Sequence, residues 1–151
     1  MKKTLILAVC LLPLGSALFA QESSAATYAG QSCESRSSGS PLAYGTHGAS
    51  NTGSNPILIT CPATRTFDMA GGEGRIDGTI YFVNDGRSKT CVFENFDIDT
   101  GGFGLWHSLT GVRRLAFPSL YPGRRWSPLT FNCTLPAGST VVGYTVIEHA
   151  P

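Results

Sequence analysis

The concentrated cationic and aromatic stretch of this 151-residue chain runs from Arg113 to Trp126. Its residues with binding chemistry are Arg113, Arg114, Tyr121, Arg124, Arg125 and Trp126. Aromatic faces stack on sugar rings, and guanidinium groups bind carboxylate, sulfate or phosphate through paired hydrogen bonds. This stretch is therefore the ligand-binding surface that the sequence predicts. The alternative is a proline-rich loop whose aromatic side chains cover the core while its arginines face water.

Acidic residues offer a second kind of chemistry. The carboxylates in question are Glu73, Asp77, Glu94, Asp97 and Asp99. A glycosidase needs two carboxyl groups about 5 to 9 Å apart across a sugar, and a sequence does not fix that separation. Asp97 and Asp99 also match the start of a calcium loop, but the remaining ligands of such a loop are missing. A strand end with aspartates facing water is the favoured interpretation there.

The three histidines have no spacing typical of a metal site. His47 lies in a glycine-rich segment, His107 follows Trp106, and His149 is two residues from the last residue given. We predict surface or rim positions for them. The chain also has no Gly-x-Ser-x-Gly nucleophile motif and no complete phosphate-binding loop. The sequence therefore predicts no catalytic residue, no metal and no cofactor.

Cysteines indicate the compartment. Beyond the first 20 residues the chain has an even set, Cys33, Cys61, Cys91 and Cys133. In an exported chain such a set indicates two disulfides, and the absence of Cys-x-x-Cys argues against a zinc knuckle or a redox site. Three pairings are possible. We favour Cys33 with Cys61 and Cys91 with Cys133, because each would join near elements, and each bridge would stabilise the fold by about 3 to 4 kcal/mol.

The N-terminus has the layout of a secretory signal peptide. Two lysines precede an apolar run from Thr4 to Leu12, and small residues follow from Gly15 to Ala17. Cleavage after Ala20 would leave Gln21 first, and cleavage after Ala17 is an alternative. The run is too short to span a membrane, and no later stretch reaches the roughly 20 apolar residues of a spanning helix. We expect a secreted or periplasmic protein without a transmembrane segment.

The chain divides into a signal peptide at 1–20, an arm at 21–55 and a body at 56–151. The arm is rich in Ser and Gly, has few large apolar residues and is expected to be mostly loop, tethered to the single domain by Cys33. Without the signal, nine Lys and Arg (eleven minus two) face ten Asp and Glu. This balance gives no reason to expect nucleic acid as a partner.

Beyond Asn55 the hydrophobic period is two, as in half-buried strands. The clearest case places Leu129, Phe131, Cys133 and Leu135 on one face. The segment 57–61 alternates in the same way, and we expect Pro62 to end it. The segment 76–83 is expected to form a hairpin with 90–93 through a tight turn at Asn84-Asp85-Gly86. A change of frame after Phe93 predicts a bulge near Glu94 and Asn95.

Further strands at 105–109, 112–117 and 141–147 bring the expected total to about seven or eight. No window of a dozen residues has helical spacing, so helices should be absent or a single turn. Many short strands with frequent turns predict an all-β fold, a two-sheet antiparallel sandwich with immunoglobulin-like or jelly-roll connectivity.

A set of sequence marks covers most of the chain after the signal. They are Asn51 ahead of a strand ending Cys61-Pro62, Cys91 in a mid-chain strand, Cys133-Thr134-Leu135-Pro136, and a closing Tyr144-Thr145-Val146-Ile147-Glu148. The pattern resembles small exported proteins of Gram-negative bacteria with no assigned activity. That resemblance implies a disulfide-bridged β-sandwich and implies no catalytic site.

The leading functional hypothesis is a non-enzymatic binding module for a glycan or a cell-envelope partner, acting through the Arg113–Trp126 stretch. A small secreted hydrolase with paired carboxylates is an alternative. A structural subunit of an envelope assembly is another, and it would show as a long uncapped edge strand available to a neighbour.

Overall fold

The computed structural model describes residues 23–65, 74–97, 102–120 and 128–150. The predicted signal peptide lies outside them. The elements, in chain order, are β1 (Ser23–Ala29), η1 (Gly30–Ser32), β2 (Glu34–Ser35), β3 (Leu42–Gly45), β4 (Gly48–Asn51), β5 (Ile57–Ala63), β6 (Arg75–Phe82), β7 (Lys89–Asp97), β8 (Gly102–Gly111), β9 (Arg114–Leu120), β10 (Leu129–Leu135) and β11 (Thr140–His149). Within the described residues the helical content is the single 3-10 turn η1.

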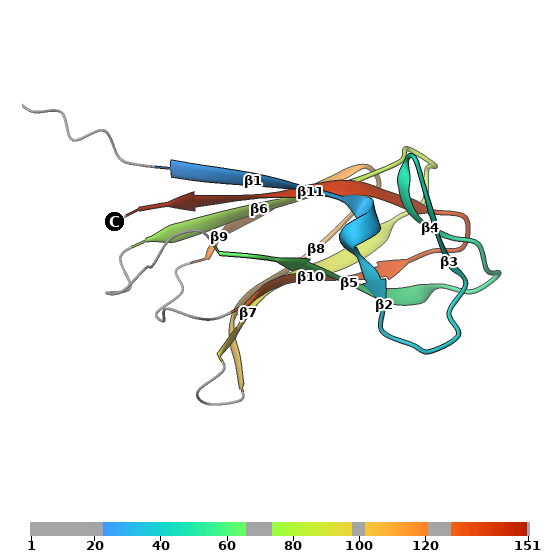
Figure 1. The fold of residues 1–151 in the computed structure, drawn as a ribbon, viewed down its shortest axis with the longest axis horizontal. Helices are drawn as coiled ribbons and strands as arrows, with labels where there is room; N and C mark the ends of the chain where they lie inside the picture. Colours follow the sequence, from blue (N-terminus) through green and yellow to red (C-terminus); the bar gives the residue numbers. More distant parts are fainter. Residues whose placement is uncertain (1–22, 66–73, 98–101, 121–127, 151) are drawn as a thin grey trace, which may run out of the picture.

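The strands form two antiparallel sheets packed as a sandwich, which confirms the predicted fold class (Figure 1). Sheet A has the order β3-β4-β11-β6-β9, with β1 also paired to β11. Sheet B has the order β2-β5-β10-β7-β8 and lies below sheet A in Figure 1. The chain changes sheets between β6 and β7, and β6 pairs with β9 while β7 pairs with β10. Immunoglobulin-like sandwiches cross their central strands in the same way.

Inward-facing side chains follow the predicted alternation. In β10 the residues Leu129, Phe131, Cys133 and Leu135 are all fully buried. Ile76, Ile80 and Phe82 of β6 face the same interior, with Gly78 between them. The core sits between the sheets, so the polar residues of alternate positions are left on the two outer faces.

Aromatic rings make the central contact between the sheets. The ring of Phe131 in sheet B lies 4.5 Å from Phe93, 5.6 Å from Phe117 and 5.4 Å from Tyr144, measured between ring centroids. Gly78 gives these rings room, because a Cβ at this position would lie 2.7 Å from Phe93 and 2.9 Å from Phe131. A glycine in a central strand is therefore required by packing here.

Both disulfides form with the favoured pairing. Cys33 bonds to Cys61, and Cys91 bonds to Cys133, its cross-strand partner in β10. All four residues are fully buried; Cys91–Cys133 joins two strands of sheet B, and Cys33–Cys61 joins the residue before β2 to β5. This chemistry is that of a protein that folds in an oxidising compartment. No helix of the described residues is long and apolar enough to cross a membrane.

The arm at 21–55 is not mostly loop, contrary to the prediction. Its described part contributes β1 to β4, and β1 pairs with β11 over seven residues from Ser23 to Ala29. The main anchor is Tyr28, whose ring stacks on Tyr144 at 4.9 Å and whose hydroxyl donates to the Thr64 carbonyl. The prediction failed because most side chains of these strands are small and the strands pair through the backbone, which needs no alternation of large apolar residues.

The predicted hairpin between 76–83 and 90–93 is wrong as well. Gly86 has the expected positive φ of 73°, but the chain crosses from sheet A to sheet B after it. The crossing places Phe82 and Cys91 on the two inner faces of the sandwich, where both side chains are buried. In sheet B, β7 pairs with β10, which begins at Leu129, 32 residues after the end of β7 at Asp97.

Two smaller expectations concern strand bounds and register. Pro62 does not end the strand, since β5 continues to Ala63 with Pro62 in register with Thr130. The bulge is confirmed, because the β7–β8 register shifts between Glu94 and Phe96.

Replacing Gly78 with alanine tests the aromatic contact between the sheets. We expect Gly78→Ala to lower the free energy of unfolding by about 1 to 3 kcal/mol, because the added methyl overlaps two rings. Urea titration followed by tryptophan fluorescence measures this change. Gly45→Ala is the matched control, since nothing lies within 4 Å of a Cβ at that position. Equal midpoints for the two variants would contradict the packing role of Gly78.

Candidate functional site

The structure describes two residues of the predicted arginine and aromatic surface. Arg113 and Arg114 are exposed, at the turn between β8 and β9 and at the start of β9. Tyr121, Arg124, Arg125 and Trp126 lie outside the described residues. Strand β9 is extended over seven residues, so Arg114 and Leu120 lie about 20 Å apart at about 3.3 Å per residue. The described part of the predicted stretch therefore extends along the length of β9.

Carboxylates of the predicted hydrolase fall on different surfaces. Asp77 is at an outward position of β6 in sheet A, and Glu94 is at an outward position of β7 in sheet B. The two sheets of a sandwich are about 10 Å apart with a filled core between them, so these two carboxyls do not face one sugar. Glu73, Asp99 and the side chain of Asp97 lie outside the described part.

Asp77 is at the centre of a polar group on sheet A. Its carboxylate accepts a hydrogen bond from the Ser119 hydroxyl of β9 and lies 2.9 Å from Nε2 of His149 in β11. This is not a nucleophile triad, because in a triad the serine bonds to the imidazole and the carboxylate orients that imidazole from the other side. The group joins three strands at the end of sheet A. The other histidines lie elsewhere, His47 exposed before β4 and His107 in β8.

The described part of the chain holds no group of three or more His, Cys, Asp or Glu that could bind a metal ion. The contacts of Ser119 and His149 with Asp77 link strands β9, β11 and β6.

A denser polar group lies on the outer face of sheet B. Nδ2 of Asn132 in β10 donates to Oε1 of Glu94, and Oγ1 of Thr60 in β5 donates to Oδ1 of Asn132 at 2.6 Å. The Thr130 hydroxyl lies 3.4 Å from the same Glu94 oxygen. Carboxylate, amide and hydroxyl groups from three adjacent strands are thus fixed in one row on a flat surface.

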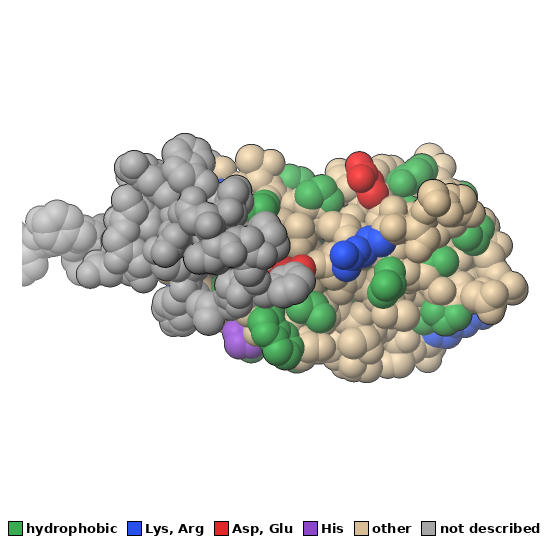
Figure 2. Space-filling model, turned by 90° about the horizontal axis from the view of Figure 1, so that it is seen from below, with side chains coloured by type: hydrophobic (Ala, Val, Ile, Leu, Met, Phe, Trp, Pro, Cys, Tyr) green, Lys and Arg blue, Asp and Glu red, His purple; other side chains and the backbone are tan. Residues whose placement is uncertain are grey.

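Trp106 completes this surface. It is in register with Glu94 across the β7–β8 pair and its side chain is 58% exposed, the largest value among the exposed large hydrophobic residues described. Figure 2 views the molecule from the side of sheet B and shows isolated hydrophobic and charged side chains on a mostly uncharged face. The candidate site, called the Trp106 face from here on, is made of Trp106, Glu94, Asn132, Thr130 and Thr60.

Electrostatics of the Trp106 face depend on Glu94. Burial raises the pKa of its carboxyl above the usual range, and Thr130, the positive charge of Arg36 and Asn132 oppose that shift only in part. Burial therefore destabilises the charged form of Glu94, and its carboxylate can accept further hydrogen bonds from a ligand.

Sequence reasoning missed this face although each strand carried part of the signal. In the sequence, Glu94 is one of several carboxylates, Trp106 is the neighbour of His107, and Asn132 is a polar residue within an alternating segment. Each lies in the outward frame of its strand. Only the register between strands, which puts Trp106 opposite Glu94, brings them together.

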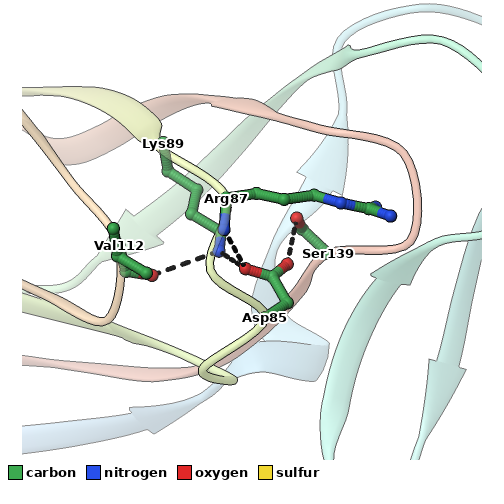
Figure 3. A network of polar contacts seen from close by, with 5 residues as sticks. All are labelled: Asp85, Arg87, Lys89, Val112 and Ser139. Carbon is green, nitrogen blue, oxygen red and sulfur yellow. Dashed lines mark hydrogen bonds and ion pairs between the residues drawn. The ribbon is translucent and has the colours of Figure 1, made fainter.

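A second polar network closes the opposite part of the sandwich (Figure 3). The Lys89 side chain is fully buried and pairs with Asp85, and its Nζ donates to the Val112 carbonyl at 3.1 Å. Asp85 also accepts from the Ser139 hydroxyl and from the backbone N–H of Arg87. Burial opposes the charged form of Asp85, but these hydrogen bonds and the Lys89 charge prevail and hold the pKa of that carboxyl well below its usual range.

This network ties together the three connections β6–β7, β8–β9 and β10–β11. Nζ of Lys89, both carboxylate oxygens of Asp85 and the Ser139 hydroxyl all have partners within the protein. Nζ of Lys89 also lies 5.6 Å from the ring centroid of Phe82. We assign it to stability and not to ligand binding, because Lys89 is closed off from solvent.

Comparisons with known proteins add no family or relative: no protein-family model, no curated protein and no solved structure matches the chain. The site therefore has to be interpreted from its own chemistry.

Replacing Asp85 tests the role of the buried ion pair. We expect Asp85→Asn to lower the free energy of unfolding by about 3 kcal/mol near neutral pH, because Lys89 is left buried without its counter-charge. Since the folded-state pKa of Asp85 is lowered, its contribution is present above the unfolded-state pKa of about 4 and is lost as the pH falls towards the folded value. The difference between wild type and variant should shrink below about pH 4.

Urea titrations at several pH values measure this difference. Asp77→Asn is the matched control, because it removes a partly exposed aspartate paired with a partly exposed histidine. We expect this control to cost less than about 1 kcal/mol. If Asp77→Asn lowers the free energy of unfolding as much as Asp85→Asn does, the burial of Lys89 does not explain the effect of Asp85→Asn.

Proposed function

We propose that this protein is a non-enzymatic glycan-binding module and that the Trp106 face is its binding surface. The observation that carries the proposal is an exposed indole ring in register with a carboxylate that has spare acceptor capacity. An aromatic ring offers the apolar face on which a sugar ring stacks. The neighbouring carboxylate accepts hydrogen bonds from sugar hydroxyls, and the amide and hydroxyl groups can both donate hydrogen bonds to them and accept hydrogen bonds from them.

The surroundings of Trp106 favour a sugar over other ligand classes. The outward positions of sheet B include many uncharged hydrogen-bonding side chains, namely Thr60, Thr90, Ser108, Thr110, Thr130, Asn132 and Thr134. Among the described residues, Arg36 brings one positive charge to Glu94, which is short of the row of lysines and arginines that binds nucleic acid phosphates. The exposed large apolar residues described on this face, Trp106 and Leu58, lie on different strands, β8 and β5, and do not form the continuous apolar centre of a protein interface. The envelope protein partner considered from the sequence is therefore the second choice.

The compartment follows from the same proposal. We propose that the protein is exported and acts outside the inner membrane, as a secreted or periplasmic protein. The two disulfides support this location, as does the signal layout of the first 20 residues. Glycans are abundant in both locations.

Trp106→Ala tests the binding surface. We expect purified wild-type protein to be retained on at least one polysaccharide of a glycan array, and Trp106→Ala to bind about tenfold more weakly, since stacking contributes about 0.5 to 1.5 kcal/mol. Tyr81→Ala is the matched control, because it removes an exposed aromatic ring from the opposite sheet. Equal loss in both variants would contradict a site on sheet B.

The segment 121–127 is tested by the same array. Changing Arg124, Arg125 and Trp126 together to alanine should leave retention unchanged if the Trp106 face is the site. Loss of retention in the triple variant, with Trp106→Ala unaffected, would move the site to that segment. Absence of any retained glycan would remove the proposal.

A further inference from the structure

Strand β8 forms an open edge of sheet B. In the described part of the chain it pairs with β7 on one side and with no strand on the other. In an antiparallel sheet, about half of the N–H and C=O groups of an edge strand point away from its partner and remain available for pairing. The strand is ten residues long, from Gly102 to Gly111, and after the register shift its residues 106–111 form a regular open edge of six residues.

Strand β8 lacks most of the usual protection of an edge strand. Proteins guard open edges with charged residues, prolines, bulges or very short strands. The register shift opposite Asn95 gives β8 one bulge, and residues 106–111 beyond it pair regularly with β7. The sequence of β8, GFGLWHSLTG, contains no acid, no Lys or Arg and no proline. Its outward side chains include Trp106, and Val112 just beyond its end is also exposed.

The other edges differ from β8. Strand β9, the edge of sheet A, contains Pro118 and begins at Arg114. Strand β2 has two residues, one of them Glu34, and β5 beside it contains Pro62. Strand β1 also lacks charges, but its outward residues are small. Among the described edges, β8 alone is long, uncharged and aromatic.

We propose that the β8 edge binds the β8 edge of a second copy of this chain. Two identical antiparallel edges related by a twofold axis are self-complementary, because each free donor meets a free acceptor. No like charges within β8 oppose the approach. The pairing would join two five-stranded sheets B into one sheet of ten strands.

Charges at the C-terminal end of β8 favour the same antiparallel pairing. Arg113 and Arg114 follow this end and are exposed. Antiparallel pairing places the C-terminal end of one β8 beside the N-terminal end of the other. The arginines of the two copies therefore lie at opposite ends of the seam, where like charges do not meet.

The inference goes beyond glycan binding and does not depend on it. A twofold axis perpendicular to the sheet keeps both outer faces on the same side. Two Trp106 faces would then form one continuous surface, with both exposed rings beside the new seam. The twofold contact occupies the β8 edge of both copies, so it gives a closed dimer. It does not extend into the longer assembly that the envelope-subunit alternative requires.

Sedimentation velocity of the oxidised protein without any glycan tests the proposal. We expect a monomer–dimer equilibrium in the wild type. Ser108→Lys, an exposed position of β8, should weaken dimerisation by about tenfold because two like charges meet at the seam. Ala116→Lys is the matched control, at an exposed position of the edge strand β9, and should leave the equilibrium unchanged.

A charge exchange separates edge pairing from loss of folding. Ser108→Glu should also be monomeric alone, and a mixture of Ser108→Glu with Ser108→Lys should form a mixed dimer. A wild type that stays monomeric at every concentration tested would overturn the proposal. Equal weakening by Ala116→Lys, or a Ser108→Lys variant that dimerises normally, would overturn it too. Failure of glycan retention with the dimer intact would leave this inference standing and remove only the proposed function.

Discussion

The close approach of the two sheets at Gly78 is the contact on which the architecture depends. Two phenylalanine rings from sheet B, Phe93 and Phe131, lie where a side chain of β6 would otherwise be. Phe117 and Tyr144 meet them from sheet A, so one aromatic cluster joins strands that are distant in sequence. Because the rings fill the interior, the polar chemistry of alternate positions is left on the outer faces and at the ends of the strands.

The placement of polar residues on two separate outer faces favours the binding-module hypothesis over the two-carboxylate hydrolase. Asp77 and Glu94 occupy outer faces of different sheets, so the packed core keeps them from acting on one substrate. Each has its own polar partners, Ser119 and His149 in one case and Asn132 and Thr130 in the other. A flat face with one exposed ring and one carboxylate suits recognition better than two-carboxylate hydrolysis, which needs acid and base on opposite sides of one bond.

The sequence predicted the strands that bury large side chains, because alternation of apolar and polar residues follows burial. It also predicted both disulfides, because the cysteines form an even set. It did not predict β1 to β4, whose small side chains pair through the backbone, or the crossing after Gly86. The candidate site was missed for a related reason. Trp106, Glu94 and Asn132 belong to three strands, and only long-range register makes them neighbours.

The position of the disulfides gives the Trp106 face a rigid support. The Cys91–Cys133 bridge lies within sheet B, and Cys33–Cys61 ties β5 of that sheet to the residue before β2. Cys91 is in register with Leu109 of β8 on one side and Cys133 of β10 on the other. Binding on such a surface orders few loops, which lowers the entropic cost of recognition. One stacked ring on a flat face still gives a modest affinity. A second face in the same plane would raise it through avidity, since the second contact becomes intramolecular. Under the two proposals, the open edge of β8 and the Trp106 face would both serve glycan binding.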